Sequence, residues 1–360
     1  IDLSIQAAVE HVLEGGMRLL NAKGAVAILM EVDTGRVISL ASLPDFDPNH
    51  RPGLPVRGSA DDSPLFNKAI QGVYELGSTF KIFTVAQALE LDLVDPKTKI
   101  NTKGPIRMGG HKINDYRNNG PELPVWQVIT ESSNLGTARI AKMIGPEKQR
   151  EFLSSLGFTK PTSIEMIEAS GGKPLLPKRW NELETMTISY GHGLSVTPLH
   201  LATGYATLAN GGRLVKPTLL EQEKLGLGQQ IISKEVAKNS LAMLRGVVTE
   251  GTASLADVNG YFVAGKTGTA DKPSAQGGYD KEKNITSFAS IFPIHEPKYV
   301  LVVTLDEAQD TSGPEPKRTA GWTAVPVSAE IIARVAPLLG LRPKFDNKSS
   351  VGVTLSNWQE

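Results

Sequence analysis

The sequence predicts an α+β fold, in which an antiparallel sheet is flanked by helices from the two ends of the chain and a mostly helical subdomain is inserted. Three observations support this fold class. The chain opens with a helical pattern and a hairpin pattern, it closes with strand patterns and another helical pattern, and the region from about 60 to 240 is mostly helical. Because both ends carry strands, one shared sheet covered by both terminal helices is the simplest arrangement.

The N-terminal region predicts a helix followed by a β-hairpin. Over residues 4–20 apolar side chains recur at helical spacing behind Asp2 or Ser4, which are candidate caps. Two β-prone runs, 25–32 and 37–41, are joined by the turn sequence Asp-Thr-Gly-Arg. An irregular crossing to the helical region follows, marked by Pro44, Pro48, Pro52 and Pro55.

The C-terminal region predicts three strands and a final helix. The strand patterns are Tyr261–Ala264, Thr286–Phe292 and Tyr299–Leu305, and the helical run is Val327–Leu339. The segment Asp271–Lys283 is polar and contains glycine, which indicates a mobile loop between two of these strands.

These patterns predict one domain at residues 1–341 and a polar tail at 342–360. Within the domain we expect a sheet subdomain at about 1–58 plus 241–341 and a helical subdomain at about 59–240. A chain of 360 residues with 40% hydrophobic content can bury a core of this size.

The composition narrows the classes of function. Lys+Arg and Asp+Glu both count 38, so the bulk charge gives no reason to expect nucleic acid as a partner. The absence of cysteine excludes thiol catalysis, cysteine-ligated zinc and disulfides. No apolar run approaches the roughly 18 residues of a membrane span.

The first chemical motif is Ser78-Thr79-Phe80-Lys81, at the start of a nearly all-apolar run that follows Gly77. Such a run predicts a helix buried on most sides, with Ser78 and Lys81 on one face of its first turn. Burial lowers the pKa of a lysine, so the neutral amine of Lys81 can take the proton of the Ser78 hydroxyl.

The pattern Ser-x-x-Lys is weak by itself, because the chain contains a second copy. Ser170-Gly171-Gly172-Lys173 also fits, but its paired glycines oppose a helix and predict a loop. The apolar helix after Ser78 is therefore what selects Ser78 as the candidate nucleophile.

The second motif is Ser132-Ser133-Asn134, between the helical runs Val125–Thr130 and Asn134–Met143. A hydroxyl and a carboxamide on this turn suit a proton relay through Ser132 and a substrate amide held by Asn134. Helix capping by the same residues is the alternative explanation for an isolated motif of this kind.

The third motif is Lys266-Thr267-Gly268-Thr269, at the end of a predicted strand. Gly268 has no side chain, so a substrate backbone can lie against the strand as an added strand. Lys266 and the hydroxyls of Thr267 and Thr269 suit a carboxylate, and the backbone N–H groups of Thr269 and Ser78 suit an oxyanion. An ordinary strand end with a solvated lysine is the alternative.

The three motifs in this order resemble the signature of the penicillin-binding proteins and serine β-lactamases. Ser132 follows Ser78 by 54 positions and Lys266 follows Ser132 by 134, which is similar to the transpeptidase domains. Further segments resemble class B penicillin-binding proteins, and the Ser-Ser-Asn-Leu-Gly and Lys-Thr-Gly sequences are most similar to the division-specific type (FtsI-type, penicillin-binding protein 3). These segments are Asn67–Ala69, Tyr190–Pro198, Asn210–Gly212 and Gly246–Ala253.

The chain departs from the family pattern at Leu76, where many relatives carry proline. The family resemblance implies the penicillin-binding protein/serine β-lactamase-like fold, with catalytic residues Ser78, Lys81, Ser132, Asn134 and Lys266 and substrate-binding residues Thr267, Gly268 and Thr269.

The resemblance implies a peptidoglycan D,D-transpeptidase that cross-links stem peptides ending in D-Ala-D-Ala during septal wall synthesis and is acylated by β-lactam antibiotics. It also implies division proteins, including a glycosyltransferase, as partners. Class B members have an N-terminal membrane anchor and a pedestal domain. Because the chain begins at Ile1 without Met, we expect a fragment lacking both, whose domain lies on the periplasmic side of the membrane.

Two other interpretations remain open. One is a β-lactam sensor or a non-catalytic division scaffold, and the other is a serine β-lactamase or D,D-carboxypeptidase in which water deacylates the serine. We predict no cofactor and no metal, because no histidines stand at ligand spacing. The histidines are His11, His50, His111, His192, His200 and His295. His192 is expected to be structural, and Asp115–Arg117 is expected to be a solvated loop.

Overall fold

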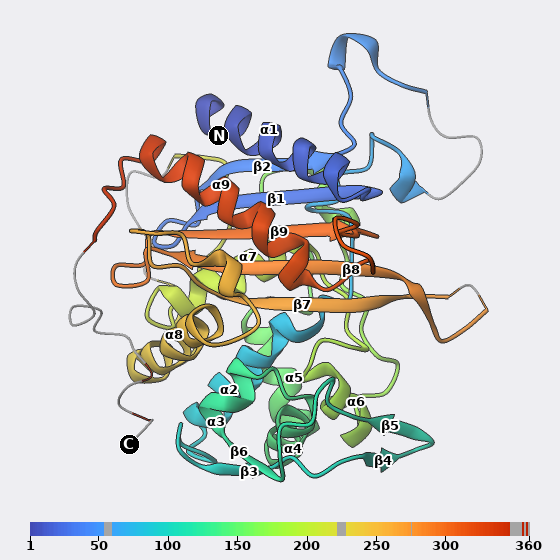
Figure 1. Ribbon diagram of the computed structural model, residues 1–360, viewed down its shortest axis with the longest axis vertical. Helices are drawn as coiled ribbons and strands as arrows, with labels where there is room; N and C mark the ends of the chain where they lie inside the picture. Colours follow the sequence, from blue (N-terminus) through green and yellow to red (C-terminus); the bar gives the residue numbers. More distant parts are fainter. Residues whose placement is uncertain (54–59, 222–227, 275, 346–354, 356–357, 359–360) are drawn as a thin grey trace.

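The computed structural model describes residues 1–53, 60–221, 228–274, 276–345, 355 and 358. Its centre is an antiparallel sheet in the order β2-β1-β9-β8-β7 (Figure 1). The strands are β1 (Gly24–Glu31), β2 (Val37–Leu43), β7 (Ala264–Pro273), β8 (Tyr279–Phe292) and β9 (Tyr299–Asp306). β1 pairs with β9 over its whole length, from Gly24↔Asp306 to Glu31↔Tyr299. The prediction that both chain ends share one sheet is confirmed.

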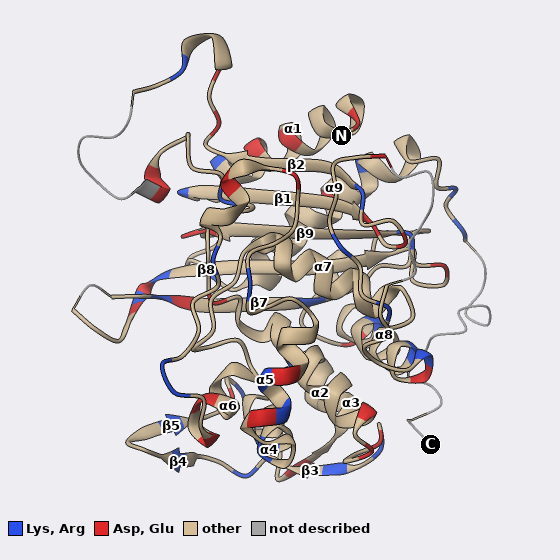
Figure 2. Cartoon of the chain, turned by 180° about the vertical axis from the view of Figure 1, so that it is seen from behind, with Lys and Arg blue, Asp and Glu red and all other residues tan. Residues whose placement is uncertain are grey.

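Helices cover both faces of this sheet. The terminal helices α1 (Leu3–Leu19) and α9 (Ala324–Leu338) pack on the face seen in Figure 1. Helix α7 (Pro198–Ala209) packs on β1, β8 and β9 from the other side, which Figure 2 shows from behind. Because β1 and β9 are covered on both faces, nearly every residue in them is buried and their sequences are continuous apolar runs.

The middle of the chain is mostly helical, as predicted. Its other helices are α2 (Lys81–Glu90), α3 (Val125–Thr130), α4 (Asn134–Ile144), α5 (Pro146–Ser155), α6 (Glu182–Ile188) and α8 (Lys234–Thr249). Two small sheets were not predicted, because strands of three residues are too short to show a period. They pair β3 (Lys99–Asn101) with β6 (Glu122–Pro124), and β4 (Ile106–Met108) with β5 (His111–Ile113).

The predictions for the β7–β8 region were wrong in position. The strand expected at Tyr261–Ala264 begins only at Ala264 and runs to Pro273, through two glycines that hide it from a pattern of apolar residues. The loop expected at Asp271–Lys283 is largely strand, because β7 and β8 continue beyond the sheet as a two-stranded arm, seen at the right of Figure 1. The arm is exposed, so its residues are polar although they are paired.

The predicted tail at 342–360 lies mostly outside the described residues. Of the part that is described, Leu355 is buried in the hydrophobic core and the backbone N–H of Lys344 donates to the carbonyl of Gly260. The boundaries of the two subdomains, at 59 and 240, stay a prediction. Helix α7 belongs to the middle region in sequence, although it packs on the sheet.

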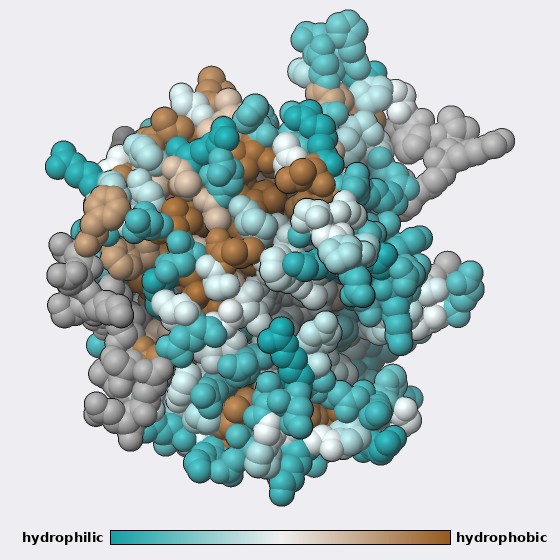
Figure 3. Space-filling model, in the orientation of Figure 1, coloured by the Kyte–Doolittle hydropathy of each residue, from teal (hydrophilic) through white to brown (hydrophobic). Residues whose placement is uncertain are grey.

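An apolar groove of about 690 Å³ lies between α1 and α9. Apolar side chains gather on this face of the molecule in Figure 3, and they include Leu19, which is 79% exposed, and Trp322, which is 45% exposed. Two adjacent glycines of α1 line the groove but meet different surroundings. A Cβ on Gly16 would lie 2.7 Å from Val327 Cγ2 of α9, whereas a Cβ on Gly15 would meet nothing within 4 Å.

We therefore expect opposite effects from two neighbouring substitutions. Gly15→Ala should raise the free energy of unfolding by about 0.5–1 kcal/mol, because alanine favours the helix and fills open space. Gly16→Ala should lower it by about 1–3 kcal/mol, because the added methyl group pushes α1 away from α9. Urea unfolding of both variants measures the difference. Equal effects would contradict close packing of the two helices at Gly16.

Candidate active site

Ser78 lies in a short 3-10 turn, Gly77–Phe80, that runs directly into α2. The backbone N–H of Lys81 donates to the carbonyl of Ser78, and Lys81 is the first residue of the α-helix. Side chains three apart are eclipsed in a 3-10 turn, so Ser78 and Lys81 share a face as predicted. The difference from the prediction is that the first turn is 3-10 rather than α-helical.

The apolar character of α2 buries Lys81 completely. The rings of Phe80 and Phe83 lie 5.7 Å apart, and Phe83 also packs on Phe158 at 5.0 Å, which fixes the start of the helix. Lys81 has 0% of its surface exposed, whereas Ser78 is only half-buried. The amine of Lys81 is therefore in a dry setting, whereas Ser78 is partly open to solvent.

Ser132 lies on the turn between α3 and α4, as predicted, and Asn134 is the first residue of α4. The alternative of helix capping applies to Ser133 instead, because the Oγ atom of Ser133 accepts from the backbone N–H of Gly136 at 2.9 Å. Ser132 has a left-handed backbone with φ of 58°, a conformation that costs a serine about 1–2 kcal/mol. Since Ser133 supplies the cap, the Ser132 hydroxyl is available for other contacts.

Two buried amines meet at that hydroxyl. Ser132 Oγ accepts from Lys81 Nζ at 3.0 Å and from Lys266 Nζ at 2.9 Å, and Lys81 Nζ also donates to the carbonyl of Ser132. A hydroxyl has two acceptor lone pairs and one proton. With both lone pairs engaged, the Ser132 proton is left to point at a third group.

The charges of the two lysines are suppressed by their surroundings. Burial lowers the pKa of Lys266 to about 7. Burial, and then the charge of Lys266, hold the pKa of Lys81 well below its ordinary value. Burial therefore favours the neutral form of the amine at this site, which is what the sequence analysis required of Lys81.

Lys266 to Thr269 lie within β7, not at its end as predicted, and pair with Ala289 to Thr286 of β8. β7 is the edge strand of the sheet, and its outer edge packs on the turn that carries Ser78. A Cβ on Gly268 would lie 2.2 Å from the carbonyl oxygen of Leu76, so only glycine allows this approach. Gly268 thus brings the strand against the candidate nucleophile turn.

Neighbouring residues orient the threonines of β7. Thr252 Oγ1 and Thr267 Oγ1 are hydrogen-bonded at 2.7 Å, and the backbone N–H of Ala320 donates to Thr269 Oγ1 at 3.1 Å. Sequence reasoning assigned no role to Thr252 or Ala320. Thr252 lies in the segment Gly246–Ala253 that carries the family resemblance, but only the folded chain brings it and Ala320 to β7.

Asp115 was also missed, because the segment Asp115–Arg117 was predicted to be a solvated loop. Asp115 Oδ2 accepts from Ser133 Oγ at 2.7 Å and Oδ1 accepts from the backbone N–H of Leu135 at 2.9 Å. Tyr116 is 89% exposed, so the prediction holds for that residue. A single carboxylate that stands 18 and 20 positions before its two partners leaves no local pattern in the sequence.

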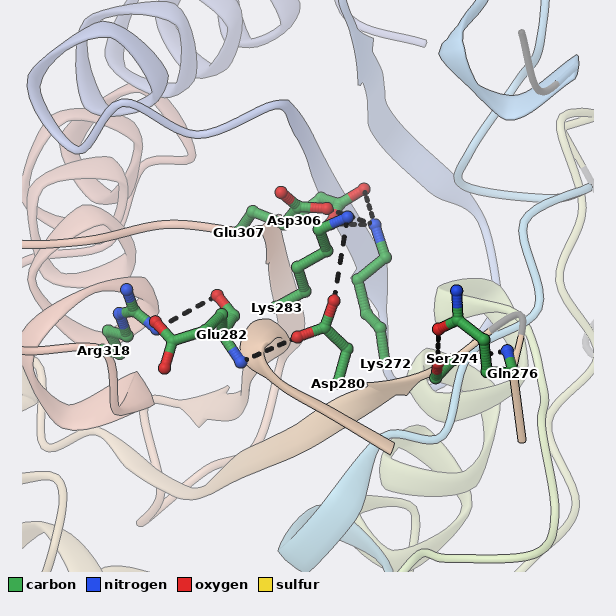
Figure 4. Close-up of polar contacts among 9 residues, drawn as sticks. All are labelled: Lys272, Ser274, Gln276, Asp280, Glu282, Lys283, Asp306, Glu307 and Arg318. Atoms are coloured by element: carbon green, nitrogen blue, oxygen red, sulfur yellow. Dashed lines mark hydrogen bonds and ion pairs between the residues drawn. The ribbon is translucent and has the colours of Figure 1, made fainter. Parts of the chain in front are cut away.

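Two contacts hold the β7–β8 arm, from neighbouring positions of its ladder, where Lys272 pairs with Asp280 and Pro273 pairs with Tyr279. Tyr279 Oη donates to Glu75 at 3.0 Å, and Glu75 Oε1 also accepts from the backbone N–H of Gly193 at 2.7 Å. Lys272 bridges Asp306 and Glu307 at 2.8 Å each, as Figure 4 shows. The arm is therefore tied both to the sheet and to the segment just before Ser78.

His192 lies beside this arm. Its ring contacts those of Tyr190 and Tyr279, with centroids 5.2 and 5.8 Å away, and burial lowers its pKa. The structural role expected for His192 stays a prediction. Ser170 is exposed and lies within a 3-10 turn, Ile167–Gly171, that does not lead into an α-helix. Asn134 Nδ2 donates to the carbonyl of Asn114 at 3.0 Å.

Among the residues that the structure describes, no cluster of three or more His, Cys, Asp or Glu side chains is arranged to hold a metal ion. None of the helices described combines the length and the apolar character needed to cross a bilayer.

Comparisons with known proteins support the family resemblance that the three motifs indicate. The family model "Penicillin binding protein transpeptidase domain" matches residues 25–332. The probable peptidoglycan D,D-transpeptidase FtsI of Caulobacter vibrioides is 34% identical over 96% of this chain. FtsI of Escherichia coli K12 is 30% identical over 95% of it. The chain spans 59% and 56% of the length of these two relatives.

Solved structures share the fold. The apo transpeptidase domain of penicillin-binding protein 3 from Burkholderia pseudomallei has a TM-score of 0.83 at 31% identity, covering 96% of this chain and 97% of that one. Penicillin-binding protein 3 from Mycobacterium tuberculosis, solved with aztreonam, has a TM-score of 0.83 at 26% identity, covering 95% and 79%. The predicted α+β fold of this type is confirmed.

The buried Lys266 predicts a stability that depends on pH. Burial lowers its pKa from 10.5 to about 7, so between these values the unfolded chain binds a proton that the folded chain does not. The parent therefore loses stability as the pH falls from 10.5 towards 7, and a methionine at this position avoids the loss.

Lys266→Met should raise the melting temperature, and by more at about pH 7 than at about pH 9. Thermal melts of parent and variant at both pH values measure this. Lys216→Met, at an exposed position, is the matched control for loss of a lysine. A gain of equal size at both pH values would contradict the shifted pKa.

Proposed function

Because the chain belongs to the penicillin-binding protein transpeptidase domain family, we propose that it catalyses peptidoglycan D,D-transpeptidation through an acyl-enzyme on Ser78. The observation that supports this most strongly is the meeting of Lys81 and Lys266 at the Ser132 hydroxyl, since Lys81 follows directly on the 3-10 turn that carries Ser78. This arrangement offers a base, a proton relay and a cation for the proposed nucleophile.

In the first half-reaction, Ser78 Oγ attacks the carbonyl carbon of the penultimate D-Ala of a stem peptide. The neutral amine of Lys81 takes the hydroxyl proton, and the backbone N–H groups of Ser78 and Thr269 face the developing oxyanion. The C–N bond to the terminal D-Ala then breaks. A proton delivered through Ser132 neutralises the leaving amine, and an ester on Ser78 remains.

In the second half-reaction, an amine of a neighbouring stem peptide attacks that ester. Its proton returns through the same groups to Ser78 Oγ, the C–O bond breaks, and a new amide joins the two peptides. The two half-reactions together exchange one amide for another, so no cofactor is needed.

The remaining motif residues bind the donor peptide. Lys266 and the hydroxyls of Thr267 and Thr269 hold the terminal carboxylate. The peptide lies along the edge of β7 at Gly268 as an added strand, while the absent side chain of Gly268 leaves room for the carbonyl of Leu76. Asn134 orients a substrate amide through its carboxamide. A β-lactam offers the same carbonyl and carboxylate, and its tethered leaving group stays in place after acylation.

The cellular setting is inferred from relatives named FtsI. We propose septal wall synthesis, with division proteins including a glycosyltransferase as partners. We further propose an N-terminal membrane anchor outside this chain, with this domain on the periplasmic side. The proposed transpeptidase domain comprises residues 1–341, of which 25–332 match the family model.

Acylation by benzylpenicillin tests the proposed nucleophile. Intact mass should show one stable adduct per chain over hours, and Ser78→Ala should abolish it because the attacking hydroxyl is gone. Ser170→Ala, which alters the exposed second Ser-x-x-Lys, is the matched control and should acylate as the parent does.

The alternatives predict other outcomes. Absence of an adduct on the parent chain would contradict the proposal. Rapid return to the unmodified mass, with the drug consumed, would indicate a β-lactamase.

A further inference from the structure

Asp115 belongs to the segment between β5 and β6, outside the three motifs. Its two carboxylate oxygens accept from Ser133 Oγ at 2.7 Å and from the backbone N–H of Leu135 at 2.9 Å. The carbonyl of the preceding residue, Asn114, accepts from Asn134 Nδ2 at 3.0 Å. This segment therefore binds all three residues that follow Ser132.

The turn at Ser132 needs such support. Its left-handed backbone is unfavourable for serine and persists only where neighbouring contacts hold it. Ser133 supplies one fixed point, because its hydroxyl accepts from the N–H of Gly136 while it donates to Asp115. Loss of the carboxylate would leave the turn free to relax, and the Ser132 hydroxyl would move away from the lysine amines.

Asp115 also acts through its charge. Burial and the charge of Lys266 lower the pKa of Lys81, whereas the negative charge of Asp115 raises it. His192 is a third ionisable group within electrostatic range of Lys81. Asp115 thus opposes the effect of Lys266 on the candidate base.

We propose that Asp115 is a positioning residue for acyl transfer, which holds the Ser133–Leu135 turn so that Ser132 stays between the two lysines and places a fixed negative charge near Lys81. The inference rests on the proposed function, in which Lys81 is the base. Asp115 itself touches neither substrate nor the reacting atoms.

Two substitutions separate the geometry from the charge. Asp115→Asn keeps an oxygen for the N–H of Leu135 and an amide group that can donate to Ser133, but removes the charge. Asp115→Ala removes both the hydrogen-bonding groups and the charge. Glu122→Gln, on the nearby strand β6, removes an exposed carboxylate that pairs with Lys99 and is the matched charge control.

The rate constant for acylation by a fluorescent penicillin, measured as a function of pH for the whole chain, is the readout. Asp115→Ala should acylate on the order of 10–100-fold more slowly, because the Ser132 hydroxyl is misplaced. Asp115→Asn should stay within a few-fold of the parent at its plateau. The acidic limb of the pH–rate profile of Asp115→Asn should move to lower pH. Without the negative charge of Asp115, Lys81 becomes neutral at a lower pH. Glu122→Gln should leave the profile in place.

An unmoved acidic limb in Asp115→Asn, or an Asp115→Ala variant as fast as the parent, would overturn the inference. If Asp115→Ala lacks a cooperative melting transition, the pH profile of Asp115→Asn decides alone. Failure of the parent chain to be acylated would instead overturn the proposed function, so the two failures are distinguishable.

Discussion

The structure depends on placing two lysine amines in a dry interior, where both contact the hydroxyl of Ser132. Two cations cannot share one neutral partner in a desolvated setting at low cost, so the surroundings must keep at least one amine neutral. This requirement explains why each amine comes from a rigid element. Lys81 comes from the start of α2, a helix that is buried at nearly every position, and Lys266 from the edge strand of the central sheet.

The second constraint is the close approach of that edge strand to the Ser78 turn. Gly268 allows contact with the backbone of Leu76, and Gly77, with φ of 56°, allows the turn itself. The sheet is held by β1 and β9 at its centre, so the position of β7 follows from the pairing of strands from both ends of the chain. The terminal regions of the sequence therefore set the position of a site whose nucleophile lies in the middle.

Much of this could be predicted because it depends on local pattern. The helical repeat before Leu20, the hairpin after it and the apolar run after Ser78 each determine their own conformation. The positions of β7 and its arm could not be predicted, because glycines and polar residues interrupt the pattern while pairing with β8 maintains the strand. The roles of Asp115, Thr252 and Ala320 were missed for a different reason. Their hydrogen-bond partners lie at least 15 positions away along the chain, so no local pattern links them.

The central claim is that Ser78 transfers a peptide acyl group, and not only that a drug modifies it. The most direct measurement follows a synthetic stem peptide ending in D-Ala-D-Ala, together with an amine acceptor, and quantifies free D-alanine and the new amide. The account predicts release of D-alanine with formation of the cross-linked amide, and loss of both in Ser78→Ala. A chain that penicillin acylates but that releases no D-alanine from the peptide would contradict it and would indicate a sensor.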